Sequence, residues 1–195
     1  GQTIENHLIK RNLGQLTKVT KDIQDLAMGL RMLPIKGTFQ KMQRIVRDLS
    51  TTLGKQIDLV TTGEETEVDK TILELIGDPL VHMVRNSVDH AIESTDERMQ
   101  KGKPAKGRIE LKAYHQSGKL VVEIIDDGKG LNAEIIRQIA IKKGVITATD
   151  VLTEKECQIL IFAAGFSTKS EVTDISGRGV GMDVVKTNIE MLHGS

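Results

Sequence analysis

The chain has 195 residues, of which 38% are hydrophobic and 28% charged, values that fit one globular domain with an appendage. Its 27 Lys and Arg residues balance 27 Asp and Glu residues, and aromatic residues make up only 2%, so we expect no nucleic-acid partner. The single cysteine, Cys157, excludes an intrachain disulfide and a multi-cysteine zinc site. No apolar run approaches the ~20 residues that span a bilayer, and the first residues carry no signal-peptide pattern. We therefore expect a cytoplasmic protein without direct membrane insertion.

The N-terminal segment is predicted to form one long helix with a narrow apolar stripe. Two interleaved sets of apolar residues repeat every seven positions, one formed by Ile9, Leu16, Ile23 and Leu30 and the other by Val19, Leu26 and Leu33. This spacing is that of a coiled-coil seam, and a helix from about Thr3 to Leu33 would be roughly 45 Å long at ~1.5 Å per residue. Pro34 is expected to end it. A helix so long and narrowly striped needs partner helices, so we expect a homodimer formed through it.

The remainder of the chain has the pattern of a compact α+β unit. Apolar periodicity and capping residues predict helices over 38–53 and 71–76, from Asp78-Pro79 to Glu93, from Asn132 to just before Gly144, from Thr153 onward, and over 180–193. Alternating patterns predict strands over 56–62, 108–115 and 119–126, with the last two joined as a hairpin. Residues 93–107 and 163–181 are predicted to be loops, because they are polar or rich in Gly, Ser and Thr.

A first polar cluster lies on the predicted helix that ends at Glu93. At 100° per residue, His82, Asn86, Asp89 and Glu93 fall within a ~60° stripe, with His90 at its edge. The opposite face is apolar and is expected to pack on the sheet. The Asn amide oxygen is a hard, neutral ligand of the kind that Mg²⁺ accepts. From the spacing alone, a solvated helix face remains the alternative.

A second cluster, Asp126-Asp127-Gly128-Lys129-Gly130, follows directly after an apolar strand. A carboxylate at a strand end can accept a hydrogen bond from an exocyclic amine such as adenine N6, and the glycines let the backbone pass close to a ligand. A plain turn is the alternative interpretation.

A third cluster, Gly177-Arg178-Gly179-Val180-Gly181-Met182, leads into the last predicted helix. Backbone amides at a helix N-terminus can cradle anions, which favours a phosphate site. The spacing is not that of a dinucleotide fingerprint, and the ending of a Walker A loop is absent. A flexible linker is the alternative.

The order of these three clusters resembles the Bergerat ATP-binding fold, which gyrase-type ATPases, the large heat-shock chaperone, mismatch-repair ATPases and histidine kinases share. Within that family, the stretches 30–35, 82–90, 165–168 and 176–185 are similar to signature blocks of chemotaxis-type (CheA-type) protein-histidine kinases. The resemblance implies an α+β, GHKL-type α/β sandwich with a mixed sheet and a helical layer, preceded by the coiled-coil-type helix. It also implies two domains: residues 1–35 as the second helix of a dimerisation domain, and residues 36–195 as the ATP-binding catalytic domain. The family's third glycine box and its last strands are expected beyond Ser195.

The resemblance also assigns roles to individual residues. Asn86 would bind Mg²⁺, His82 and His90 would lie near the phosphates and share the catalytic role with Asn86, and Asp126 would recognise adenine. Residues 166–176 would form a lid. The full set implied to contact Mg-ATP is His82, Asn86, Asp89, His90, Asp126, Gly128, Gly130, Ser167, Thr168, Lys169, Gly177, Arg178, Gly179, Val180, Gly181 and Met182.

The expected function is transfer of the ATP γ-phosphoryl group to a histidine on a separate phosphotransfer domain. His7 is not expected to be the acceptor, because the H-E-[LF]-x-x-P pattern of sensor kinases is absent around it. The further partners implied are a response regulator and, through domains outside this chain, a receptor and a coupling protein. The alternatives are a GHKL-type ATP hydrolase and a degenerate nucleotide-binding scaffold. His82 opposes the hydrolase, because those enzymes carry a water-activating Glu four residues before the Asn.

Overall fold

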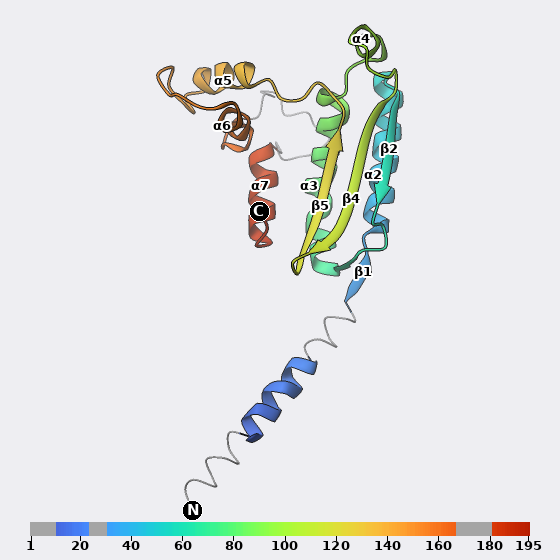
Figure 1. Cartoon of the computed structure of the whole chain (residues 1–195), viewed down its shortest axis with the longest axis vertical. Helices are drawn as coiled ribbons and strands as arrows, with labels where there is room; N and C mark the ends of the chain where they lie inside the picture. Colours follow the sequence, from blue (N-terminus) through green and yellow to red (C-terminus); the bar gives the residue numbers. More distant parts are fainter. Residues whose placement is uncertain (1–10, 24–30, 167–180) are drawn as a thin grey trace, which may run out of the picture.

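The computed structural model describes residues 11–23, 31–166 and 181–195 (Figure 1). Residues 11–23 are helical, as predicted, and their side chains are exposed, including Leu16, Val19 and Ile23 of the seam. Ile9, Leu26 and Leu30 lie outside the described residues. No helix in the described ranges is long and apolar enough to cross a membrane.

The predicted end of the first helix is wrong. Residues Met32–Pro34 form strand β1, which pairs antiparallel with β3, residues Glu67–Asp69. Two backbone hydrogen bonds extend this pairing, one from Ile35 N to Thr66 O at 3.0 Å and one from Lys70 N to Arg31 O at 3.0 Å. Ile35 itself is fully buried in the core. Pairing and burial therefore override the seven-residue pattern, which continues in the sequence through Leu33.

A three-stranded mixed sheet carries the fold, in the order β2-β4-β5. Strand β2 (Ile57–Thr62) runs parallel to β4 (Gly107–Gln116), and β4 pairs antiparallel with β5 (Lys119–Asp126). The predicted hairpin is confirmed. Its turn places Ser117 and Gly118 at φ 51° and 75°, the left-handed pair typical of a two-residue hairpin loop.

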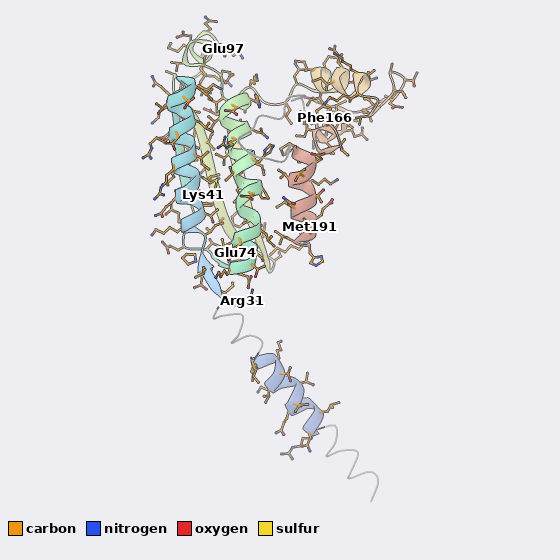
Figure 2. The ribbon with its side chains drawn as sticks, turned by 180° about the vertical axis from the view of Figure 1, so that it is seen from behind. Arg31, Lys41, Glu74, Glu97, Phe166 and Met191 are labelled. Carbon is orange, nitrogen blue, oxygen red and sulfur yellow. The ribbon has the colours of Figure 1, made fainter. Side chains whose placement is uncertain are left out.

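Two long helices cover one face of this sheet. They are α2 (Lys36–Leu53) and α3 (Lys70–Asn86), and they lie side by side in Figure 2, where Lys41 and Glu74 mark them. The buried side chains at their contact with the sheet are Phe39, Met42 and Val46 of α2, Ile76, Leu80 and Val84 of α3, and Ile109, Leu111 and Ala113 of β4. The predicted α+β architecture is confirmed.

Helix α3 merges two elements that the sequence separates. The cap is Asp69, whose side chain accepts a hydrogen bond from Thr71 N, and not Asp78. Pro79 lies inside the helix, where a proline typically costs about 3 kcal/mol. The helix continues because its apolar stripe, with Ile76 before the proline and Leu80 and Val84 after it, stays buried against the sheet.

Two further corrections concern the segment after α3. The helix does not run as an α-helix to Glu93: residues Ser87–Ala91 form a π-helical turn, η1, and Ile92 is extended. Part of the predicted loop 93–107 is helix α4 (Thr95–Gln100), which opens on a capping box between Ser94 and Glu97.

The C-terminal part adds a smaller helical layer. It contains α5 (Ala133–Lys142), α6 (Glu154–Ile159), the 3₁₀ turn η2 (Leu160–Phe162) and α7 (Met182–Met191). The predicted caps at Asn132 and Thr153 are confirmed. Ile136, Ala140 and Phe166 form a second small core. Helix α7 lies alongside α3 in both views (Figures 1 and 2). This contact joins the smaller helical layer to the main body.

A matched pair of glycines tests the packing. A Cβ on Gly63, at φ +78°, would lie 1.9 Å from the Ala113 carbonyl oxygen, whereas one on Gly77, inside α3, meets nothing within 4 Å. We expect Gly63→Ala to lower the free energy of unfolding by about 2–4 kcal/mol. Gly77→Ala should raise it by about 0.5–1 kcal/mol, because alanine is the better helix former. Urea unfolding measures both, and equal effects of the two substitutions would contradict the packing described.

Candidate functional site

The second and first predicted clusters meet where β5 ends and α3 gives way to η1. Ser87, the first residue of η1, donates a hydrogen bond from Oγ to Asp126 Oδ2 at 3.1 Å. The backbone N–H of Gly128 donates to Asp126 Oδ1 at 3.1 Å. Both carboxylate oxygens are thus fixed, and each keeps a second lone pair for an incoming donor. The half-buried Asp126 carboxylate is therefore an oriented hydrogen-bond acceptor.

The loop after Asp126 packs directly on η1. A Cβ on Gly128 would lie 2.3 Å from the Ala91 carbonyl oxygen, and Lys129 N donates to that same oxygen at 2.9 Å. Gly128 is therefore required by a contact within the protein. Gly130 is uncrowded but has φ +71°, so its requirement is conformational. The two glycines of this loop serve different purposes, which their spacing alone does not reveal.

The first and third clusters also meet. Asn86, the last residue of α3, donates a hydrogen bond from Nδ2 to Met182 Sδ at 3.3 Å. Met182 is the first residue of α7, and Gly181 is its N-cap. This contact leaves the amide oxygen of Asn86 as the end available to a cation. The remaining predicted site residues of the third cluster and the lid, Ser167, Thr168, Lys169, Gly177, Arg178, Gly179 and Val180, lie outside the described residues.

The polar stripe predicted on α3 holds only in part. His82 lies one turn before Asn86 and is half-buried, Asp89 is half-buried, and His90 is exposed. Glu93 does not share this face, and its placement in the stripe is wrong. The π-helical turn changes the angular spacing after Asn86, and the chain is extended at Ile92.

Glu93 belongs instead to a buried ion cluster that the sequence did not predict. Arg98, fully buried, contacts Glu93 at 3.3 Å and Asp127 at 2.7 Å. Lys103 Nζ donates to Glu93 at 3.0 Å and to the carbonyls of Asp127 and Gly128 at 3.0 and 2.9 Å. Lys101 completes the cluster at 3.3 Å from Glu93. Arg98 and Lys103 thereby hold the loop after Asp126.

The cluster shifts the titration of both its carboxylates. Burial acts to raise the pKa of Glu93, but hydrogen bonds from Lys103, its own backbone and Lys101 outweigh burial and lower that pKa to about 2. Burial likewise opposes a lower pKa at Asp127, and the hydrogen bonds from Arg108 N and Arg98 again prevail. Both groups stay ionised through the physiological range and keep the loop in place. The only sequence signal for this arrangement was the density of charge between 93 and 106.

The arrangement suits a nucleotide and a hard cation. In the described ranges, no three His, Cys, Asp or Glu side chains gather into a metal cage. Mg²⁺ does not need one, because it is commonly held by one or two protein oxygens together with phosphates and water. The amide oxygen of Asn86 fits that role, and Asp126 fits an exocyclic amine.

Comparison with known proteins identifies the family. Residues 76–195 match the model for histidine kinase-, DNA gyrase B- and HSP90-like ATPases. The chain belongs to this family. The matched region begins within α3 and includes each of the three clusters, so membership implies an ATP-binding domain and confirms the predicted GHKL fold.

The predicted resemblance to CheA-type kinases is confirmed as well. The chain is 48% identical to the chemotaxis protein CheA of Rhizobium meliloti over 95% of its length, and 45% identical to that of Bacillus subtilis over 98%. It is 50% identical over 93% of its length to the sensor histidine kinase CheAY of Helicobacter pylori. The chain spans only 24%, 29% and 23% of these three relatives. A solved histidine kinase domain from the blue-light activated histidine kinase of Erythrobacter litoralis EL346 matches 53% of this chain and 48% of that chain, with TM-score 0.38 and 20% identity, too weakly to bear on the fold.

The pH dependence of stability tests the ion cluster. Because the pKa of Glu93 is lowered from 4.5 to about 2, its ionised form stabilises the fold above about pH 4.5, and this contribution is lost as the pH falls toward 2. Glu93→Gln should therefore cost about 2–4 kcal/mol of unfolding free energy at neutral pH, and the gap to the parent protein should shrink as the pH is lowered from about 5 to about 2.

Glu74→Gln is the matched control, because Glu74 forms only an exposed pair with Lys70 one turn earlier. It should change stability by less than about 0.5 kcal/mol throughout. Urea titrations across this pH range measure both, and a Glu93→Gln effect that does not vary with pH would refute the assignment.

Proposed function

We propose that this chain is the ATP-binding catalytic part of a protein-histidine kinase, which binds Mg-ATP and transfers the γ-phosphoryl group to a histidine on a separate phosphotransfer domain. The observation that carries the proposal is the junction of α3, η1 and β5. Neighbouring residues Asn86 and Ser87 link the two ends of a nucleotide site there: Asn86 faces Met182 at the start of α7, and Ser87 orients Asp126.

Each residue then has a chemical role. Asp126 would accept a hydrogen bond from the adenine amine, and the Asn86 amide oxygen would hold Mg²⁺. His82 and His90, on the same helical run, would lie near the phosphates, and Asp89 would contact the nucleotide from that run. From the resemblance alone, we assign phosphate contacts to Gly177 through Met182 and to the predicted lid residues Ser167, Thr168 and Lys169. Mg²⁺ held there would supply charge neutralisation for the transferred group, and positioning by the protein would supply most of the remaining catalysis.

Transfer to histidine is favoured over hydrolysis by the identity of residue 82. Helix α3 has His82 one turn before Asn86, where the hydrolytic branch has a glutamate that activates water. Without a carboxylate at that position, water is a poor nucleophile in this site. The γ-phosphoryl group is then kept for an imidazole that another domain brings in.

The partners follow from the CheA-type relatives. We propose a two-component, chemotaxis-type pathway in the cytoplasm, with a response regulator downstream and a receptor and coupling protein bound through domains outside this chain. The exposed seam residues Leu16, Val19 and Ile23, 55–67% accessible, support homodimerisation through the N-terminal helix. We keep residues 1–35 as part of a dimerisation domain and residues 36–195 as the catalytic domain within this proposal.

Nucleobase selectivity tests the role of Asp126. We expect the chain to bind ATP at least about tenfold more tightly than GTP, because guanine presents a carbonyl oxygen to the carboxylate and leaves two acceptors unpaired. Asp126→Ala should weaken ATP binding and reduce the preference. Asp58→Asn, an exposed carboxylate paired with Lys106, should change neither. Isothermal titration calorimetry measures these affinities. Equal affinities of the parent chain for ATP and GTP would rule out this role of Asp126.

Phosphotransfer tests the role of Asn86. Asn86→Asp adds a negative charge beside the phosphates and changes the metal ligand, so we expect transfer from labelled ATP to an added histidine-containing phosphotransfer domain to fall at least about a hundredfold. Glu74→Gln, near the other end of α3, should transfer normally. Without the acceptor domain the chain should gain no stable label. Acid-labile label on His7, His115 or His193, or rapid ATP turnover in water, would contradict the kinase assignment.

A further inference from the structure

Lys55 makes an unusually complete set of contacts with the turn beside the nucleotide site. It follows Gly54, the left-handed cap that ends α2, and precedes β2. Its Nζ donates to the backbone carbonyls of Val88, Asp89 and Ile92, at 2.7, 3.0 and 2.7 Å. All three donors of the ammonium group are thus used on a single turn of chain that is 33 to 37 residues away in sequence.

These contacts supply hydrogen-bond donors to carbonyl groups at the end of η1. The last carbonyls of any helix lack partners within the helix, and they form its negative end. Here the Ser87 carbonyl accepts from Ile92 N at 2.9 Å, and the Ala91 carbonyl accepts from Lys129 N at 2.9 Å. Lys55 takes the carbonyls of Val88, Asp89 and Ile92. One cation therefore binds three carbonyls at the end of the π-helical turn.

The same turn fixes the nucleotide site from two sides. Its first residue, Ser87, holds Asp126 by the side chain, and its last residue, Ala91, holds the loop after Asp126 by the backbone. Gly128 packs so closely on the Ala91 carbonyl that the two cannot shift independently. A shift of the turn must therefore move the Asp126 carboxylate, the loop backbone, or both.

We propose that Lys55 is a positioning residue for nucleotide recognition: by binding the three carbonyls it sets the π-helical turn, and through Ser87 and Ala91 it aligns Asp126 with the adenine amine. The proposal rests on the proposed ATP site and adds a residue outside the three sequence clusters. Lys55 itself touches no nucleotide in this scheme. Burial lowers the pKa of its ammonium group and the nearby Asp89 carboxylate counteracts this, which matches a cation enclosed by backbone dipoles.

The test compares four variants of the full 195-residue chain with the parent: two at Lys55 and two controls. Lys55→Met keeps the aliphatic stem and removes all three donors, whereas Lys55→Gln retains an amide that can serve two carbonyls. Lys106→Met is the matched control, because Lys106 lines the same surface groove as Lys55 but its ammonium pairs only with the exposed Asp58. Met42→Ala, in the core between α2 and the sheet, is a second control for a general loss of stability.

Two measurements are made below the unfolding temperature of every variant. The first is amide hydrogen exchange without nucleotide, read at Ile92 and Lys129, whose N–H groups bond within and onto the turn. The second is calorimetric affinity for ATP and GTP. For Lys55→Met we expect faster exchange at both amides, ATP affinity reduced about tenfold, and a smaller ATP-to-GTP ratio. Lys55→Gln should be intermediate, and both controls should keep the parent's selectivity and exchange at these amides.

The outcomes separate the proposal from its premise. Parent-like ATP affinity and selectivity in Lys55→Met, or in Lys55→Gln if the first variant does not fold, would overturn the positioning role. An equal loss of selectivity in Met42→Ala would overturn it too, because the effect would then follow from stability alone. Failure of the parent chain to bind ATP would reject the proposed function, and the exchange data would still decide whether Lys55 sets the turn.

Discussion

The C-terminal end of α3 is the constraint on which the candidate site depends. There the helix changes from α to π winding, and its last carbonyls must find partners away from water. Lys55 and the backbone of Lys129 supply them. Because Asn86 ends the α-helical part and Ser87 begins the π-helical part, the same few residues set the directions of the Asn86 amide, the proposed metal ligand, and of the hydroxyl that orients Asp126.

The buried ion cluster complements this arrangement from the other side of the loop. Arg98, Lys101 and Lys103 surround Glu93, and two of them also hold Asp127 or its carbonyl. Removing charges from water is costly, and such a cluster is tolerated when nearly every donor and acceptor is paired, as it is here. The cluster fixes the backbone of residues 127–128. It thereby helps strand β5 to hold Asp126, the residue directly before them.

In the Lys55 contacts and in the ion cluster, cations bind backbone carbonyls. This arrangement suits a site that binds a polyanion. Lys55 and Lys103 bind backbone carbonyls of the framework. The nucleotide contacts proposed above come from other groups: the Asn86 amide, two imidazoles, the carboxylates of Asp89 and Asp126, and the glycine-rich segment before α7. At residue 82, one turn before Asn86, the proposed site has an imidazole where the hydrolytic branch has a carboxylate, and this favours transfer over hydrolysis.

Much of this protein can be read from its sequence, because the information is local. Caps at Asn132 and Thr153, the turn at Ser117-Gly118 and the alternation in β4 and β5 each depend on neighbouring residues, and all are confirmed. The order of the three clusters was sufficient to predict the family. The resemblance also predicts that Asn86 and Asp126 belong to one site, whereas the spacing of either cluster alone left a surface helix or a plain turn open.

Only the tertiary structure decided the features that depend on distant partners. Pro79 sits inside α3 because burial on both sides of it outweighs a lost hydrogen bond, and residues 32–34 are a strand because β3 pairs with them. The π-helical turn, the burial of Glu93 and Arg98, and the position of Lys55 on three carbonyls have no local signature: each forms only when segments some five to forty residues apart meet. Sequence periodicity shows which face of an element is apolar. It does not show which backbone groups stay unpaired until another segment forms hydrogen bonds with them.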